Sequence, residues 1–173
     1  MIISNSSPLI HLARVGKIDP LLRFHDKIII PRAVFKEVIE DGIKAGYSDA
    51  IYLNNLISQG KIEVRDIQQQ DPELQEYLHP GEYESILLAQ ELELPLVLDD
   101  RKARIVSSNR NLKCSTSLLA MLELFDNQII DYDHFQKNVK EYGSFGWISP
   151  DVIELYLREA ELKTKRIENE GDE

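Results

Sequence analysis

The chain has 173 residues, 43% of them hydrophobic and 29% charged, and its formal net charge is −10. This length and balance predict one globular domain with a substantial core. No apolar run approaches the roughly 18 residues of a membrane span. The acidic balance argues against broad non-specific binding to nucleic acid, which needs a basic footprint, but it is compatible with a nuclease site built from carboxylates.

Cys114 is the only cysteine, which excludes internal disulfides and a cysteine-built zinc site. No basic stretch precedes an apolar one near Met1, so we expect no secretory signal. Together these features predict a reducing, cytoplasmic location and no membrane partner. We expect Cys114 to be a small core residue.

The first predicted element is a short buried strand at residues 1–3. Ser7 followed by Pro8 predicts the start of the next helix, because a hydroxyl cap and a proline are typical of a first turn. Asn5 would then lie at the carboxyl end of the first strand. Its side chain offers a neutral oxygen, which ligates a cation without the Coulomb attraction of a carboxylate.

The next apolar run, residues 27–31, predicts a second strand that ends at a proline. An apolar stripe over 33–39 predicts a helix, and Glu37 interrupts that stripe. A further helix is predicted at 48–58. Residues 60–67 alternate between apolar and polar side chains, which indicates an edge strand or a half-exposed one.

A helix that opens at Pro80 is followed by an apolar run at 96–98, which ends abruptly in Asp99 and Asp100. A short apolar run closed by charge predicts a buried parallel strand, and acids just after such a strand lie where open α/β sheets bind ligands. Two carboxylates there suit a hard divalent cation. Alternatively, they cap the helix predicted at 101–108.

The remaining chain predicts a small strand and three helices, at 112–114, 116–125, 132–142 and 150–165. Because short strands alternate with helices, we expect a three-layer α/β domain with a mainly parallel sheet. Residues 1–150 would form this domain. Residues 151–173 would form a C-terminal helix that frays into a disordered acidic tail, or else a partner-binding extension.

Four side chains would converge on one cleft if the first strand and the 96–98 strand are neighbours: Asn5, Glu37, Glu84 and Asp100. Two like charges about 4 Å apart repel by about 4 kcal/mol at an effective dielectric near 20, so such a cluster predicts a bound Mg²⁺ or Mn²⁺. The alternative for Glu37 is a solvated helix residue, and Asp99 competes with Asp100 for the site. Glu82 and Glu84 are two residues apart, so at most one would be a ligand.

Other chemistries find little support in the sequence. His11 lies in an apolar run, where a packed or surface histidine is favoured over a catalytic one. No Ser-His-Asp spacing, phosphate-cradling glycine loop or dinucleotide fingerprint is present. Nucleophilic hydrolases and nucleotide-cofactor enzymes are therefore disfavoured.

Four blocks of the sequence, residues 3–10, 30–37, 81–86 and 98–104, resemble PIN-domain proteins in their order and spacing. The resemblance covers about the first 120 residues. It is closest to a prokaryotic PIN-like subfamily whose members are often toxins of toxin–antitoxin pairs.

The resemblance implies a three-layer α/β/α PIN-like fold and a ribonuclease dependent on Mg²⁺ or Mn²⁺. It places catalytic acids at Glu37, Glu84 and Asp100, and metal ligands at these three residues together with Asn5 and Asp99. The first position departs from the active PIN pattern, which has aspartate where this chain has Asn5, although members of the subfamily also carry asparagine there. The amide removes a few kcal/mol of charge–charge attraction at the metal.

The sequence thus predicts a PIN-like endoribonuclease that hydrolyses RNA phosphodiester bonds as the toxin of a toxin–antitoxin pair. Arg101 and Arg104 are expected to contact RNA, with Lys102 as a third candidate, and the partners would be a cognate antitoxin and a second copy in a homodimer. Two alternatives stay open. The first is a catalytically weak or inactive PIN-like module that binds RNA or a protein. The second is mainly an antitoxin-binding or dimerising unit whose apolar contact is supplied by Phe145 and Trp147.

Overall fold

The computed structural model describes residues 1–146 and 148–170, with the side chains of 165–170 left out. Contacts divide the chain into two compact units, which we call the sheet unit (Met1–Ser117) and the helical unit (Leu118–Glu173). Each is described by itself. Among the helices of the described residues, none combines the length and the apolar character that a membrane crossing requires.

The sheet unit is built on five parallel strands in the order β3-β2-β1-β4-β5. The α/β fold with a parallel central sheet is therefore confirmed. β3 lies at one edge, as its alternating pattern predicted. The strands are β1 (Ile2–Ser4), β2 (Ile28–Pro31), β3 (Ile62–Arg65), β4 (Leu96–Val97) and β5 (Cys114–Ser115).

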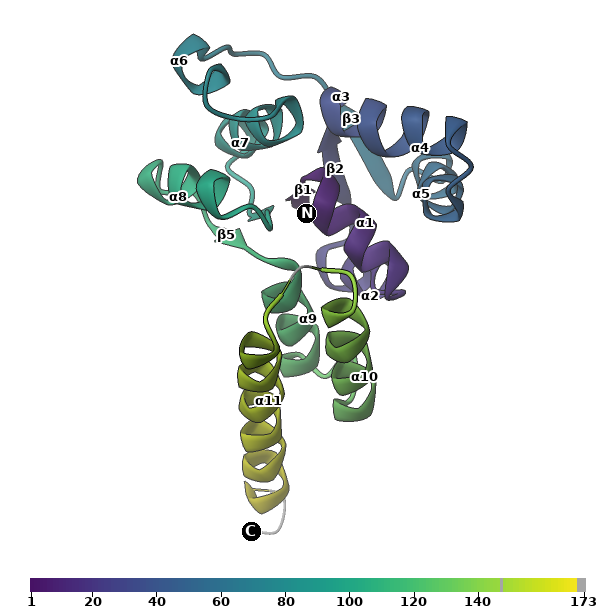
Figure 1. Ribbon diagram of the computed structural model, residues 1–173, viewed down its shortest axis with the longest axis vertical. Helices are drawn as coiled ribbons and strands as arrows, with labels where there is room; N and C mark the ends of the chain where they lie inside the picture. The colour runs from purple at the N-terminus through teal and green to yellow at the C-terminus, as the bar shows by residue number, and fades with distance from the viewer. Residues whose placement is uncertain (147, 171–173) are drawn as a thin grey trace. The chain divides into compact units, whose positions relative to one another are not determined.

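Helices cover both faces of this sheet, which explains why β1, β2 and β4 are fully buried apolar runs. With right-handed crossovers, the connections from β1 to β3 lie on one face and those from β3 to β5 lie on the other (Figure 1). The first face carries α1 (Ser6–Arg14), α2 (Ile18–His25) and α5 (Ser48–Ser58). The second carries α7 (Pro80–Leu92) and α8 (Arg101–Asn109).

The helix predicted after the second strand is one helical path with a π-helical segment inside it. It consists of α3 (Arg32–Val34), the π segment η1 (Phe35–Glu40) and α4 (Asp41–Lys44). Such π segments are rare and frequently occur at functional sites. Glu37 lies within η1. A short helix, α6 (Pro72–Gln75), precedes α7.

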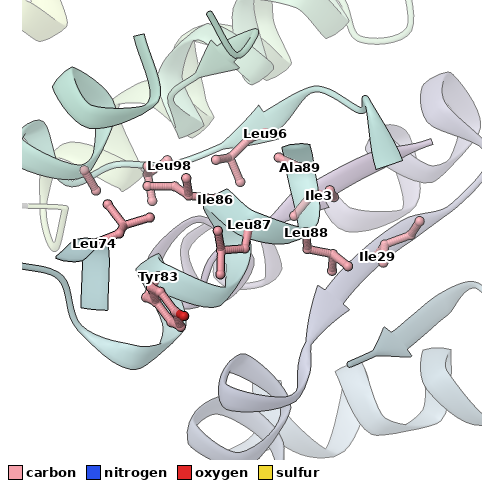
Figure 2. Close-up of a cluster of buried hydrophobic side chains, with 11 residues drawn as sticks. Ile3, Ile29, Leu74, Tyr83, Ile86, Leu87, Leu88, Ala89, Leu96 and Leu98 are labelled. Atoms are coloured by element: carbon pink, nitrogen blue, oxygen red, sulfur yellow. The ribbon is translucent and has the colours of Figure 1, made fainter. Parts of the chain in front are cut away.

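The core of the second face is an apolar cluster between α7 and the central strands (Figure 2). Apolar side chains of α7 interdigitate there with those of β1, β2 and β4, and Cys114 packs half-buried against them. This packing fixes the height of α7 over the sheet. The buried members are Ile3, Ile29, Leu74, Tyr83, Ile86, Leu87, Leu88, Ala89, Leu96, Leu98 and Ala103.

Three helices carry the end of the chain: α9 (Ser117–Asp126), α10 (Tyr132–Gly143) and α11 (Pro150–Glu170). In the helical unit the rings of Phe125 and Phe135 stack 5.4 Å apart, and Lys163 Nζ lies 2.6 Å from Asp126 Oδ2. All three helices were predicted. The predictions for Trp147 and for the last residues of the tail, 171–173, fall outside the described residues.

The structure corrects three local predictions. Helix α1 begins at Ser6 with Asn5 as its N-cap residue, so the assignment of Ser7 as the cap was wrong. β5 lies two residues later than predicted, because Cys114 and Ser115 pair with Leu96 and Val97 while Leu112 packs against the apolar cluster. α2 was not predicted.

Candidate active site

The strand order reverses between β1 and β4, since the chain passes from β1 to β2 and β3 on one side and adds β4 and β5 on the other. Open α/β sheets bind ligands at the carboxyl ends of strands beside such a reversal. Asn5 follows β1 here, and Asp99 and Asp100 follow β4. The backbone N–H of Asn5 donates to the carbonyl of Val97 over 3.2 Å, which ties the two strand ends together.

Three side-chain oxygens converge at this place, and we call them the oxygen cluster: Asn5 Oδ1, Ser6 Oγ and Glu37 Oε2. A Cβ atom on Gly81 would lie 3.0 Å from the first, 3.3 Å from the second and 3.4 Å from the third. Asn5 is only 5% exposed, and no group among the described residues hydrogen-bonds its Oδ1. A buried acceptor without a partner is costly, so the cluster is suited to a ligand that accepts its lone pairs.

Ser6 fixes the position of Glu37 in the cluster. Its hydroxyl donates to Glu37 Oε2 over 2.6 Å, across 31 residues of sequence. Glu37 is an exposed residue, so its side chain would rotate freely into solvent without this hydrogen bond. Neither Ser6 nor Gly81 was predicted as a site residue, although Ser6 follows Asn5 directly and Gly81 lies in the third sequence block.

Glu84 lies beside the cluster. It is three residues after Gly81, which places both on the same face of α7, and its Oε2 accepts the backbone N–H of Ala33 over 2.8 Å. Ala33 lies at the start of the helical path that carries Glu37. Glu84 therefore joins α7 to that path with one oxygen engaged.

Asp100 is the N-cap residue of α8, and its Oδ1 accepts the backbone N–H of Ala103 over 2.8 Å. The capping alternative considered for this acid is thus realised in the structure. Asp100 also lies near the first turn of α7: burial raises the pKa of Glu82, and the negative charge of Asp100 raises it further. Glu82 itself accepts the backbone N–H of His79 over 3.1 Å.

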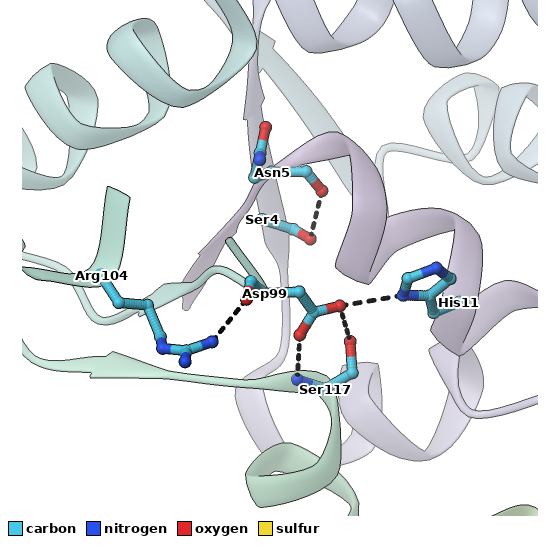
Figure 3. Close-up of polar contacts among 6 residues, drawn as sticks. All are labelled: Ser4, Asn5, His11, Asp99, Arg104 and Ser117. Carbon is cyan, nitrogen blue, oxygen red and sulfur yellow. Dashed lines mark hydrogen bonds and ion pairs between the residues drawn. The ribbon is translucent and has the colours of Figure 1, made fainter. Parts of the chain in front are cut away.

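The side chain of Asp99 points to other partners, as Figure 3 shows. It lies 2.9 Å from His11 Nδ1 and accepts both the backbone N–H of Ser117 over 2.8 Å and its hydroxyl over 2.7 Å. Burial alone would raise the pKa of Asp99, but the hydrogen bonds from His11 and Ser117 outweigh burial and hold that pKa below its usual range. Asp99 therefore joins the end of β4 to α1 and to the start of α9.

The cationic residues after Asp100 differ in their surroundings. Arg101 and Lys102 are exposed, whereas Arg104 is half-buried and donates from Nη1 to the carbonyl of Asp99 over 2.5 Å. Arg101 is the one whose guanidinium is most open to solvent-borne phosphate.

Within the described residues, no three His, Cys, Asp or Glu side chains come close enough to hold one metal ion. The reason lies in the bonds described above, since Glu84 and Asp100 each bind a backbone N–H and Asp99 faces His11. The oxygen cluster nevertheless fits a divalent cation. Mg²⁺ and Mn²⁺ prefer such hard oxygen donors, and the unpartnered Asn5 Oδ1 lies beside the Glu37 carboxylate.

Comparison with known proteins gives the following similarities. A family model described as "PIN domain" matches residues 1–162. Among solved structures, a PilT N-terminus domain protein from Sulfolobus solfataricus P2 has 18% identity and a TM-score of 0.49, covering 72% of this chain and 93% of that chain. A domain of a functionally unknown protein from Methanocaldococcus jannaschii has 20% identity and a TM-score of 0.45, covering 66% and 89%. The search of curated proteins found no match.

We predict that Asp99→Asn lowers the free energy of unfolding at neutral pH by about 2 kcal/mol, because it weakens hydrogen bonds to a charged acceptor. The folded-state pKa of Asp99 lies below its ordinary value of 3.8. Its stabilising contribution is therefore complete above that value and is lost as the pH falls through the lower folded-state pKa. Urea unfolding measured from neutral pH towards pH ~3 checks this.

The difference between wild type and Asp99→Asn should shrink over this acid range, because both side chains are then uncharged. Asp133→Asn, at an exposed acid of α10, serves as the control for the general effect of acid. A difference that stays constant with pH would contradict the role given to the Asp99 carboxylate.

Proposed function

The chain belongs to the PIN-domain family, whose model spans residues 1–162, and from this premise we propose that it is a metal-dependent endoribonuclease. PIN domains are generally nucleases that bind RNA and depend on divalent metal ions. The family membership and the nuclease class agree with the sequence prediction. The metal dependence and the RNA substrate of this chain are part of the proposal.

The observation that carries the proposal is the oxygen cluster at the strand-order reversal. Among the described residues, a buried amide oxygen without a partner lies 3.0 Å from where a Cβ on Gly81 would be, and a serine hydroxyl holds a carboxylate beside it. Hydrogen bonds within the described residues engage Ser6 Oγ and one oxygen of Glu84 but leave Asn5 Oδ1 without a partner. A cation is the ligand that would satisfy it.

In this proposal Asn5 and Glu37 would hold a Mg²⁺ or Mn²⁺ ion directly, and Glu84, Asp100 and the auxiliary Asp99 would join it by exchanging their present hydrogen bonds for the ion. The ion, when bound, supplies activation of water and neutralisation of the phosphodiester charge. Ser6 orients Glu37, and the backbone of α3 orients Glu84. Arg101 and Arg104 contact the RNA backbone. Arg104 would do so with guanidinium N–H groups other than the Nη1 group that donates to the carbonyl of Asp99.

Asn5 sets how strongly this site binds its ion. A carboxylate at this position would add Coulomb attraction that a neutral amide lacks. Unlike an aspartate, Asn5 adds no further negative charge beside Glu37, Glu84 and Asp100, so the site without an ion is less costly. We therefore expect weaker ion binding than in a chain with aspartate here.

The proposal extends to a biological role as the toxin of a toxin–antitoxin pair that forms a homodimer and is neutralised by a cognate antitoxin. The neutral Asn5, and the backbone hydrogen bonds that engage Glu84 and Asp100, favour a second candidate: an inactive PIN-like module that binds RNA or a protein partner. The experiments below separate the two.

We predict that the purified protein cleaves RNA with Mg²⁺ or Mn²⁺, that a chelator stops cleavage, and that Asp100→Asn lowers the rate at least about 100-fold. Asparagine caps a helix as well as aspartate does, so this substitution keeps α8 and removes only the charge. Gel-based cleavage of a labelled RNA measures the rate.

Exposed Asp133→Asn is again the matched control and should cleave at the wild-type rate. Expression of the wild type should arrest growth of the host cell if the toxin role holds, and Asp100→Asn should relieve that arrest. Cleavage by Asp100→Asn at the wild-type rate would contradict the proposed site.

We predict that the wild type binds Mn²⁺ and that Asn5→Asp binds it about tenfold or more tightly, because a charge replaces a neutral donor. Isothermal titration calorimetry measures both constants. Binding by Asn5→Asp with none by the wild type would favour the inactive module over the enzyme.

A further inference from the structure

The loop between α6 and α7 presents a tyrosine ring at the rim of the candidate active site. Tyr77 is 62% exposed, and no group among the described residues hydrogen-bonds its hydroxyl. On either side of it, Leu74 and Leu78 pack in or against the apolar cluster. The ring is therefore exposed on an anchored loop.

Lys102 contacts both the backbone and the ring of Tyr77. Its ammonium donates to the carbonyl of Tyr77 over 2.6 Å and lies 5.8 Å from the centroid of the Tyr77 ring. A cation on one face of an aromatic ring leaves the opposite face as the open one. The backbone of Tyr77 is therefore held by Lys102, while its ring stays exposed.

This surface is next to the proposed chemistry. Lys102 is two residues after Asp100, and its positive charge opposes the effect of Asp100 on Glu82, so the three groups lie within electrostatic reach of one another. The exposed Arg101 precedes Lys102 in the same turn of α8. An aromatic face, two cations and an acidic site therefore occur together at the carboxyl edge of the sheet.

We infer that Tyr77 is a stacking platform for an unpaired RNA base, with Arg101 and Lys102 beside it to contact the adjacent phosphates. This inference rests on the proposed function and assigns the contact with an unpaired base to the side chain of Tyr77. Bases stack on aromatic side chains only when they are splayed out of a helix, and such stacking contributes about 1–3 kcal/mol per base. The local cations offset the acidic surface elsewhere on the chain.

Binding of a fluorescein-labelled single-stranded RNA, measured by anisotropy in EDTA so that no strand is cut, tests the platform. Tyr77→Ala removes the ring but keeps the carbonyl that Lys102 binds and the net charge, so it should bind about tenfold more weakly with an unchanged salt dependence. Tyr77→Phe keeps the aromatic face and should bind like the wild type. Tyr47→Ala, at a 57% exposed tyrosine before α5, is the matched control and should also bind like the wild type.

Tyr77→Ala and the wild type should have the same affinity for an RNA duplex of the same sequence. In the cleavage assay Tyr77→Ala should raise KM while kcat stays near the wild-type value. Single-strand binding by Tyr77→Ala equal to that of Tyr47→Ala would overturn the inference and indicate a protein contact for this ring. Absence of cleavage by the wild type, with single-strand binding still lost in Tyr77→Ala, would overturn the proposed function and leave the platform standing.

Discussion

The parallel pairing of β1 with β2 on one side and β4 on the other is the constraint on which the site depends. It sets Ile3 opposite both Ile29 and Leu96, and it brings the residues after β1 and β4 to one edge of the sheet. The apolar cluster beneath α7 fixes the height of that helix, which carries Gly81 and Glu84, over the sheet. Gly81, in the first turn of α7, then closes over Asn5 and Glu37 with no side chain between them.

The chain resolves the charge repulsion at this edge in two ways. Glu84 and Asp100 each accept a backbone N–H at a helix start, where the helix dipole favours a negative charge. Asp99 is turned towards His11 and Ser117. Among the described side chains that follow β1 and β4, Asn5 Oδ1 is a buried acceptor without a hydrogen-bond partner, so it remains available as an oxygen ligand for an ion.

The sequence predicted the elements whose apolar pattern is periodic, including α5 and α7, and it predicted the parallel sheet from their alternation with strands. It could not show that Asp99 and Asp100 face different partners, because adjacent residues after a strand diverge according to which helix or hydroxyl lies nearby. Ser6 and Gly81 were missed for a related reason. Ser6 Oγ lies 2.6 Å from Glu37 Oε2, and a Cβ on Gly81 would lie 3.0 Å from Asn5 Oδ1. No local sequence pattern records these approaches between distant segments.

The central claim is that Asn5 Oδ1 and the Glu37 carboxylate bind a divalent cation. Gly81→Ala would bring a methyl carbon to 3.0 Å from Asn5 Oδ1 and 3.4 Å from Glu37 Oε2, which would crowd both ligands. Calorimetric titration of Mn²⁺ into this variant, with its melting temperature measured alongside, is the most direct test. The account predicts that Gly81→Ala still unfolds in one cooperative transition but loses Mn²⁺ binding, whereas wild-type Mn²⁺ affinity in this variant would contradict it.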